Sequence, residues 1–211
     1  MTDKNSSNQK WGKLATDESI SKAKEALSQN GFEVEVVETG KAAKEKVLEL
    51  LPKGAEVMTM TSVTLEALGV LPEINESGNY DSVRAKLNSM DRTTQGPEMQ
   101  RLGAAPEWTV GSVHAVTEDG KVMVASNTGS QLGPYAYGSG HVIWVIGTQK
   151  IVEDLDSGFK RIYEYTLPLE SERARKAYGL DGSFVSKLLI FNREVKPGRI
   201  TIIFVRENLG F

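Results

Sequence analysis

The sequence predicts an α/β fold in which helices alternate with parallel strands. An alternating apolar run at residues 32–37 is followed by an amphipathic segment at 41–51 and by a second apolar run at 55–60. A strand, a helix and a strand joined by short links form a βαβ unit, whose strands are parallel and whose crossover is right-handed. Two β-branched runs at 188–191 and 200–205 predict a strand-rich end.

The overall composition is that of an ordinary globular protein. The chain has 211 residues, which suits one domain at 15–211, preceded by a flexible, polar arm at 1–14. The net charge of −3 argues against a nucleic-acid or anionic-membrane surface. The sequence contains no cysteine, which excludes disulfides and iron–sulfur clusters within this chain. We expect a cytoplasmic protein, because no long apolar run and no secretory signal are present.

The first half of the chain reads as helices and strands in alternation. Acidic residues begin a helix at 17–29, and Asn30-Gly31 ends it. After the βαβ unit, hydroxyl side chains at Thr61 and Ser62 predict the start of another helix. We expect a loop at 72–78. Two helices of weaker periodicity should follow it, at 80–90 and at 93–103.

The second half contains the remaining strands. We expect residues 108–116 to form a hairpin with the strand that begins at Val122, because Glu118-Asp119-Gly120 is a turn signal. The segment 151–165 is helical in part, and a helix opens at Leu167-Pro168 and ends before Gly179. Residues 192–199 are predicted to be a hairpin-type loop.

The most informative stretch lies between two buried strands, at 122–125 and 142–147. The loop between them is rich in glycine, and glycine at this density indicates unusual backbone angles or close approach to a ligand. Neutral hydrogen-bonding groups gather there, which suits phosphate, carboxylate or sugar hydroxyls. The predicted ligand-binding loop comprises Ser126, Asn127, Thr128, Gly129, Ser130 and Gln131. The alternative is a turn that uses these residues for their backbone preferences.

Four further residues are candidates for the same site. Ser62 and Thr64 open a helix directly after a strand, where anions commonly dock in α/β proteins, although a simple helix cap needs them too. Glu66 is a candidate acid/base, or else a helix-start carboxylate that faces water. His141 opens a strand after the glycine loop and is a second candidate acid/base, or else a half-buried histidine bonded to backbone.

The sequence lacks the motifs of several common classes of enzyme and cofactor-binding protein. The phosphate-binding GxxxxGK[ST] motif is absent, and Gly138-Ser139-Gly140 does not continue as a dinucleotide fingerprint. The two histidines stand in different segments with no carboxylate at metal-ligand spacing, so we predict no metal site. No GxSxG nucleophile elbow is present. We therefore expect no bound cofactor.

Four segments resemble the LUD-domain (lactate-utilisation) family. They read MTMTSVTLEALGV, VASNTGSQLGPYAYGSGHVIWVIGTQKIVEDL, YTLPLESERARKAYG and GRITIIFVRENLGF, and the resemblance covers residues 15–211. It implies an α/β sandwich of the NagB/RpiA/CoA-transferase-like group, built around a mostly parallel central sheet. Related CoA-transferases use a glutamate in a turn that is similar to residues 125–129, but no glutamate stands there in this sequence.

The resemblance also suggests what the protein does. Some bacterial members take part in the oxidation of lactate, alongside partner subunits that carry iron–sulfur clusters. We therefore expect a protein that binds a small anionic metabolite in organic-acid metabolism. One alternative is an enzyme of the phosphosugar-isomerase or acyl-transfer type. Another is a cluster-free, non-catalytic subunit that docks on an iron–sulfur protein, and a homodimer is the default assembly.

Overall fold

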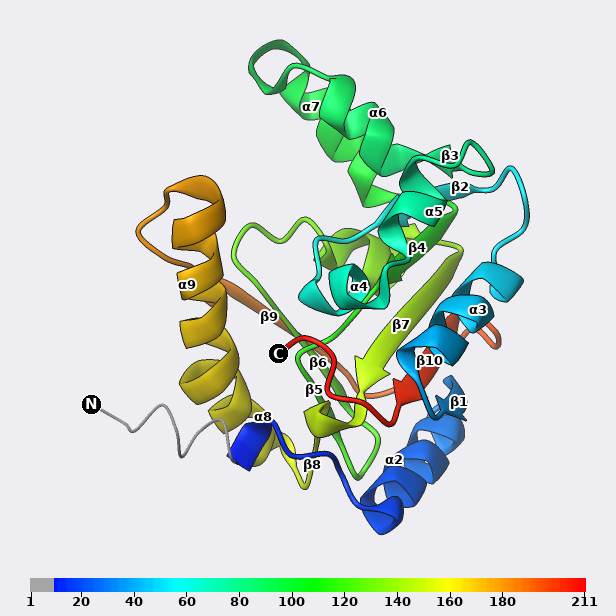
Figure 1. Ribbon diagram of the computed structural model, residues 1–211, viewed down its shortest axis with the longest axis vertical. Helices are drawn as coiled ribbons and strands as arrows, with labels where there is room; N and C mark the ends of the chain where they lie inside the picture. The colour runs from blue at the N-terminus through cyan, green and yellow to red at the C-terminus, as the bar shows by residue number, and fades with distance from the viewer. Residues whose placement is uncertain (1–9) are drawn as a thin grey trace.

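Two β-sheets stacked face to face, with helices on their outer sides, make up the fold in this computed structural model, which describes residues 10–211 (Figure 1). Apolar side chains fill three successive layers. The first lies between helices and the larger sheet, the second between the two sheets, and the third between the smaller sheet and the last helices. This confirms the predicted α/β sandwich around a mostly parallel central sheet.

The larger sheet has six strands, and every neighbouring pair is parallel. In spatial order they are β1 (Glu33–Val37), β10 (Ile200–Val205), β7 (His141–Gly147), β4 (Trp108–Gly111), β2 (Glu56–Thr59) and β3 (Asp81–Ser82). The predicted βαβ unit is present, with its strands parallel, but β10, β7 and β4 lie between them.

The smaller sheet has four strands and is mixed. In spatial order they are β8 (Ile151–Val152), β5 (Ala115–Thr117), β6 (Val122–Ser126) and β9 (Lys187–Phe191). Strand β6 runs antiparallel to both of its neighbours, and β5 and β8 are parallel.

The helices begin where side-chain oxygens can cap them. Thr16, Thr39 and Ser62 each accept a hydrogen bond from the first turn of the helix that follows. The α-helices are α2 (Asp17–Gln29), α3 (Gly40–Leu50), α4 (Val63–Leu68), α5 (Leu71–Asn75), α6 (Val83–Ser89), α7 (Arg92–Ala104), α8 (Leu155–Arg161) and α9 (Leu167–Tyr178). Shorter turns are η1 (Pro134–Gly138), η2 (Thr148–Lys150) and η3 (Ile162–Thr166). Helices α6 and α7 project away from the sheets (Figure 1).

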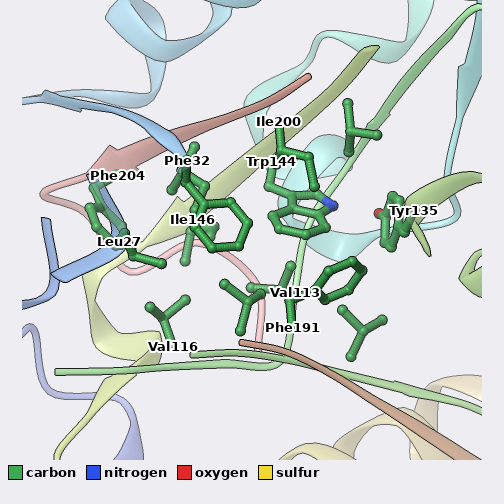
Figure 2. Packing of buried hydrophobic residues seen from close by; sticks show 14 of the residues in the cluster. Leu27, Phe32, Val113, Val116, Tyr135, Trp144, Ile146, Phe191, Ile200 and Phe204 are labelled. Atoms are coloured by element: carbon green, nitrogen blue, oxygen red, sulfur yellow. The ribbon is translucent and has the colours of Figure 1, made fainter. Parts of the chain in front are cut away.

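Strand β7 shows why both faces of the larger sheet are apolar. Its side chains alternate, so Trp144 and Ile146 face the layer between the sheets, whereas Ile143 and Val145 face the helices. Trp144 is at the centre of an aromatic cluster, in which Tyr135 meets it edge-on with ring centroids 5.3 Å apart (Figure 2). Such a run, buried on both faces, is typical of parallel strands.

Arg199 ties the glycine-rich loop to the start of β10. Its Nε donates to the carbonyl of Ser139 at 3.0 Å, and its Nη2 donates to the carbonyls of Pro134 and Tyr135 at 3.2 and 2.8 Å. Its Nη1 forms an ion pair with Glu194 at 2.6 Å, and both of these side chains are buried. The guanidinium therefore fixes η1 against the amino-terminal end of β10.

Some predicted elements differ from the structure. The predicted hairpin exists between β5 and β6, but Trp108–Gly111 belongs to the other sheet. Residues 192–199 do not form a hairpin, because β9 and β10 lie in different sheets. The predicted loop at 72–78 begins as helix α5, whose second residue is Pro72.

Most of the predicted amino-terminal arm, residues 1–9, lies outside the described residues, so its flexibility stays a prediction. The described end of the arm is held by Trp11, which is buried in the layer under the smaller sheet. Within residues 10–211, no helix has the length and apolar character needed to cross a bilayer.

Candidate functional site

A cavity of about 330 Å³ lies where strands of both sheets end beside helix α9. Residues 60–64 follow β2, residues 112–114 follow β4, and Lys150 follows β7, and all of them line it. Ligands of open parallel sheets commonly bind outside the carboxyl ends of the strands, and this volume suits a small metabolite.

Lys150 is the buried charged group of this cavity. Its side chain is 2% exposed, and its Nζ donates to Thr64 Oγ1 at 3.0 Å and to Ser112 Oγ at 3.2 Å. Within the part of the chain that the structure describes, no carboxylate forms an ion pair with it. Burial lowers the pKa of Lys150 well below its usual range, and the positive charge of Arg161 lowers it further.

Arg161 supplies a second buried positive charge behind the cavity wall. Its Nη1 donates to the His114 carbonyl at 2.5 Å and to Thr166 Oγ1 at 3.1 Å, and both of these residues line the cavity. Its side chain is 0% exposed, yet its Nε and Nη2 have no hydrogen-bond partner among residues 10–211. Burial lowers the pKa of Arg161 to about 10, so it remains charged at neutral pH.

His114 is within electrostatic reach of both basic side chains and is held neutral. Burial, followed by the charges of Lys150 and Arg161, lowers the pKa of His114 to about 3. Its Nδ1 accepts the Ala125 backbone N–H at 3.1 Å, which places the proton of the neutral ring on Nε2. His114 is therefore a fixed dipole of the cavity floor, and it contributes no charge at neutral pH.

Helix α9 forms the rim. Arg173 donates to both carboxylate oxygens of Glu170, at 2.8 and 2.7 Å, and both side chains line the cavity. The Arg173 guanidinium also lies 5.4 Å from the ring centroid of Tyr178. Since Glu170 and Arg173 neutralise each other, Arg161 keeps the surroundings of the cavity positive and attractive to anions, and Lys150 adds a second positive charge whenever it is protonated.

The structure brings most of the predicted loop to the cavity. Ser126, Asn127, Thr128, Ser130 and Gln131 all line it. Gly129 does not, but its φ of +92° makes the turn, and a Cβ there would lie 2.9 Å from the Lys187 side chain.

The same loop side chains also hold their own backbone. Ser126 Oγ accepts the Gly129 N–H at 2.8 Å and donates to Gln131 Oε1 at 3.1 Å. Thr128 Oγ1 donates to Ser130 Oγ at 3.2 Å, and both of these side chains are exposed. These hydrogen bonds are those expected if the residues serve to shape a turn. The exposed hydroxyls of Thr128 and Ser130 are also accessible to a ligand.

Ser62 and Thr64 line the cavity as well, and Glu66 does not. Ser62 caps helix α4 by accepting the Leu65 N–H at 3.4 Å. Thr64 is buried, donates to the Leu209 carbonyl at 3.1 Å and accepts from Lys150. Glu66 lies in the first turn of α4, two residues after Thr64, and is exposed.

His141 is also placed away from the cavity. It begins β7 at the amino-terminal end of the sheet, whereas the cavity lies at the carboxyl ends. Its ring stacks on Trp108 with centroids 4.1 Å apart. Neither predicted acid/base therefore reaches the cavity in this structure.

Sequence reasoning missed several polar and charged residues of the site. The residues concerned are Ser112, His114, Lys150, Arg161, Glu170 and Arg173. One signal was available, because Lys150 interrupts two apolar strands, β7 and β8, that are separated by only three residues. Within residues 10–211, no three His, Asp or Glu side chains are grouped as metal ligands would be.

Comparisons with known proteins support the family resemblance. A family model described as LUD domain matches residues 20–205. A crystal structure of a DUF162 family protein from Deinococcus radiodurans is similar in fold, with a TM-score of 0.55 and 11% sequence identity. The alignment covers 92% of this chain and 99% of that one. No match is found among curated proteins.

Proposed function

Because the chain belongs to the LUD domain family, whose model spans residues 20–205, we propose that it binds a small organic anion in the Lys150 cavity. The observation that carries the proposal is the pair of buried basic side chains, Lys150 and Arg161, with no carboxylate paired to either within residues 10–211. A buried charge is costly unless it is paired, so a bound anion would offset the charge of Arg161 and favour the charged form of Lys150.

The wall chemistry favours a carboxylate among the possible anions. Hydroxyls of Thr64, Ser112 and Thr166 surround the buried cations, and hydroxyls of Thr128 and Ser130 face the opening. A volume of about 330 Å³ is small for a nucleotide or a coenzyme A ester, but it suits a short hydroxy acid or oxo acid. Organic-acid metabolism of the lactate type is therefore the process that we propose.

A thermal-shift screen against carboxylates, phosphosugars, nucleotides and coenzyme A esters tests this proposal. A ligand that binds only the folded state at a hundredfold excess over Kd stabilises it by about 2.7 kcal/mol. We expect short hydroxy acids such as lactate to raise the melting temperature. The shift should be lost in Lys150→Met and kept in Lys160→Met, a matched change at an exposed lysine of α8. Equal shifts in both variants would refute the assignment of the anion to this cavity.

A second candidate function is docking on an iron–sulfur protein. The supporting observation is the apolar rim of the cavity, where Tyr178 is 58%, Leu180 51% and Phe184 67% exposed. Exposed apolar groups that lie together mark interaction sites. Replacing Leu180 and Phe184 by serine should abolish co-purification with a cysteine-rich partner and leave ligand shifts unchanged, whereas retained co-purification would exclude this surface.

An isomerase or acyl-transfer enzyme would need a carboxylate in the cavity. Among residues 10–211, Glu170 is the one glutamate or aspartate that lines it, and Glu66 is not part of the lining. Since both oxygens of Glu170 are occupied by Arg173, its use as a base requires that ion pair to open. Turnover of a phosphosugar or acyl ester that Glu170→Gln abolishes and Glu66→Gln preserves would establish this alternative.

A further inference from the structure

We propose that the ε-amine of Lys150 forms an imine with a small oxo acid, an organic anion that carries a ketone or aldehyde carbonyl. The inference rests on the proposed function, because it takes the cavity to be a site for organic anions. It adds a covalent step that anion binding alone does not include.

The hydrogen bonds of Lys150 match those of a neutral amine. An amine has two hydrogens and one lone pair, and Nζ donates exactly two hydrogen bonds, to Thr64 Oγ1 and Ser112 Oγ. The hydrogen of Thr64 is committed to the Leu209 carbonyl, so this hydroxyl accepts from the amine. Ser112 Oγ can accept the second hydrogen, and with both hydrogens used in this way the lone pair is available to a ligand in the cavity that Lys150 lines.

The surroundings favour the unprotonated form in the empty site. Lys150 is buried, has no carboxylate partner within residues 10–211, and lies within electrostatic reach of Arg161. Desolvation and a neighbouring cation are the two devices that activate lysine as a nucleophile towards carbonyls. The lowered pKa of Lys150 is the expected consequence of both.

The reaction is a condensation that needs no oxidant or reductant. The Nζ lone pair forms a bond to the carbonyl carbon, and the carbonyl π electrons move to oxygen, which takes up a proton. Nitrogen loses one proton, which gives a neutral carbinolamine. Protonation of its hydroxyl and departure of water leave a C=N bond, and the imine nitrogen carries a proton and a positive charge.

The product suits the cavity better than the free amine does. The protonated imine is a cation beside the carboxylate of the same substrate, so the anion gains a charged partner at Lys150. Thr64 and Ser112 lie within hydrogen-bond distance of the nitrogen that loses and regains protons. A hydroxy acid, which has no ketone or aldehyde carbonyl, can be held by the same groups but cannot condense with the amine.

Borohydride trapping of the whole protein tests the inference. The protein is incubated with pyruvate, glyoxylate or 2-oxobutyrate, reduced with sodium borohydride and analysed by intact mass and peptide mapping. Hydride addition converts the iminium to a stable secondary amine. We expect one reduced adduct per chain, located on Lys150, which is absent without borohydride and absent with lactate. Lys150→Met should lose the adduct, and Lys160→Met should keep it.

The outcomes separate this inference from the proposed function. No adduct on Lys150, in a protein that lactate or pyruvate still stabilises, would overturn the imine and leave anion binding intact. Adducts spread evenly over exposed lysines would overturn it too, because they show no special reactivity. No adduct and no stabilisation by any organic acid would overturn both. Peptide mapping of the wild-type protein decides the site even if Lys150→Met fails to fold.

Discussion

Replacing His114 by asparagine should make the protein less sensitive to acid. Asparagine Oδ1 can replace Nδ1 as the acceptor of the Ala125 N–H, and it does not titrate. In the wild type the pKa of His114 falls from 6.5 to about 3 on folding. Below pH 6.5 the unfolded chain therefore binds a proton that the folded protein does not, so wild-type stability declines as the pH falls, until the folded pKa is reached.

The size of this effect follows from the pKa shift. A difference of one in pKa between the folded and unfolded states is worth about 1.4 kcal/mol. Between pH 7.5 and pH 5, the free energy of unfolding of the wild type should therefore fall by about 2 kcal/mol relative to that of the variant. The full window down to the folded pKa would be worth about 5 kcal/mol, as an upper bound.

Urea denaturation of both proteins between pH 5 and 8 measures the difference. Carboxylates titrate in both proteins, so their contribution cancels when the two free energies of unfolding are subtracted. A difference that stays constant with pH would refute a His114 that burial keeps neutral in the folded protein. If the wild type instead became less stable relative to the variant as the pH rises, the linkage would have the wrong sign and the reasoning would be refuted as well.

Three further predictions concern the frame of the site. Arg199→Met should cost about 3–5 kcal/mol in urea denaturation, because it leaves the buried Glu194 unpaired, whereas Arg193→Met, at an exposed position, should be nearly neutral. Gly111→Ala should cost about 1–3 kcal/mol, because the added Cβ would overlap the Tyr135 hydroxyl, and an unchanged midpoint would contradict this packing. Thr128→Val combined with Ser130→Ala should abolish ligand-dependent thermal shifts without lowering the melting temperature of the free protein, and surviving shifts would make the loop purely structural.

The elements with strong local signals were predictable. Helix α2 has an acidic first turn and a closing glycine, and β1, α3 and β2 follow one another with clear periodicity. Each of these depends on residues close together in the sequence. The end of β4 at Gly111, after which the chain passes to the smaller sheet, was not predictable in this way. It involves a distant side chain, that of Tyr135, which packs directly over this glycine.

The candidate site also combines residues with a local sequence signal and residues whose role depends on distant contacts. The loop residues Ser126 to Gln131 are informative because their types are unusual together, and the structure places most of them at the cavity. Lys150 and Arg161 are common residue types whose importance comes from burial without a counter-charge among residues 10–211. Burial of this kind arises where the ends of β4 and β7 meet α8 and α9, and the only local sign of it is the position of Lys150 between the apolar strands β7 and β8.

The position of β10 has a consequence for how the chain acquires its structure. This strand is the last in sequence, yet it lies between β1 and β7 and pairs along its length with both, for example Thr201 with Glu33 and with Ile143. During synthesis, β1 must wait for more than a hundred residues before its partner exists. Such distant pairings slow folding and leave strand edges exposed to association with other chains. Early ribosome-bound forms should thus need protection from aggregation until β10 has emerged.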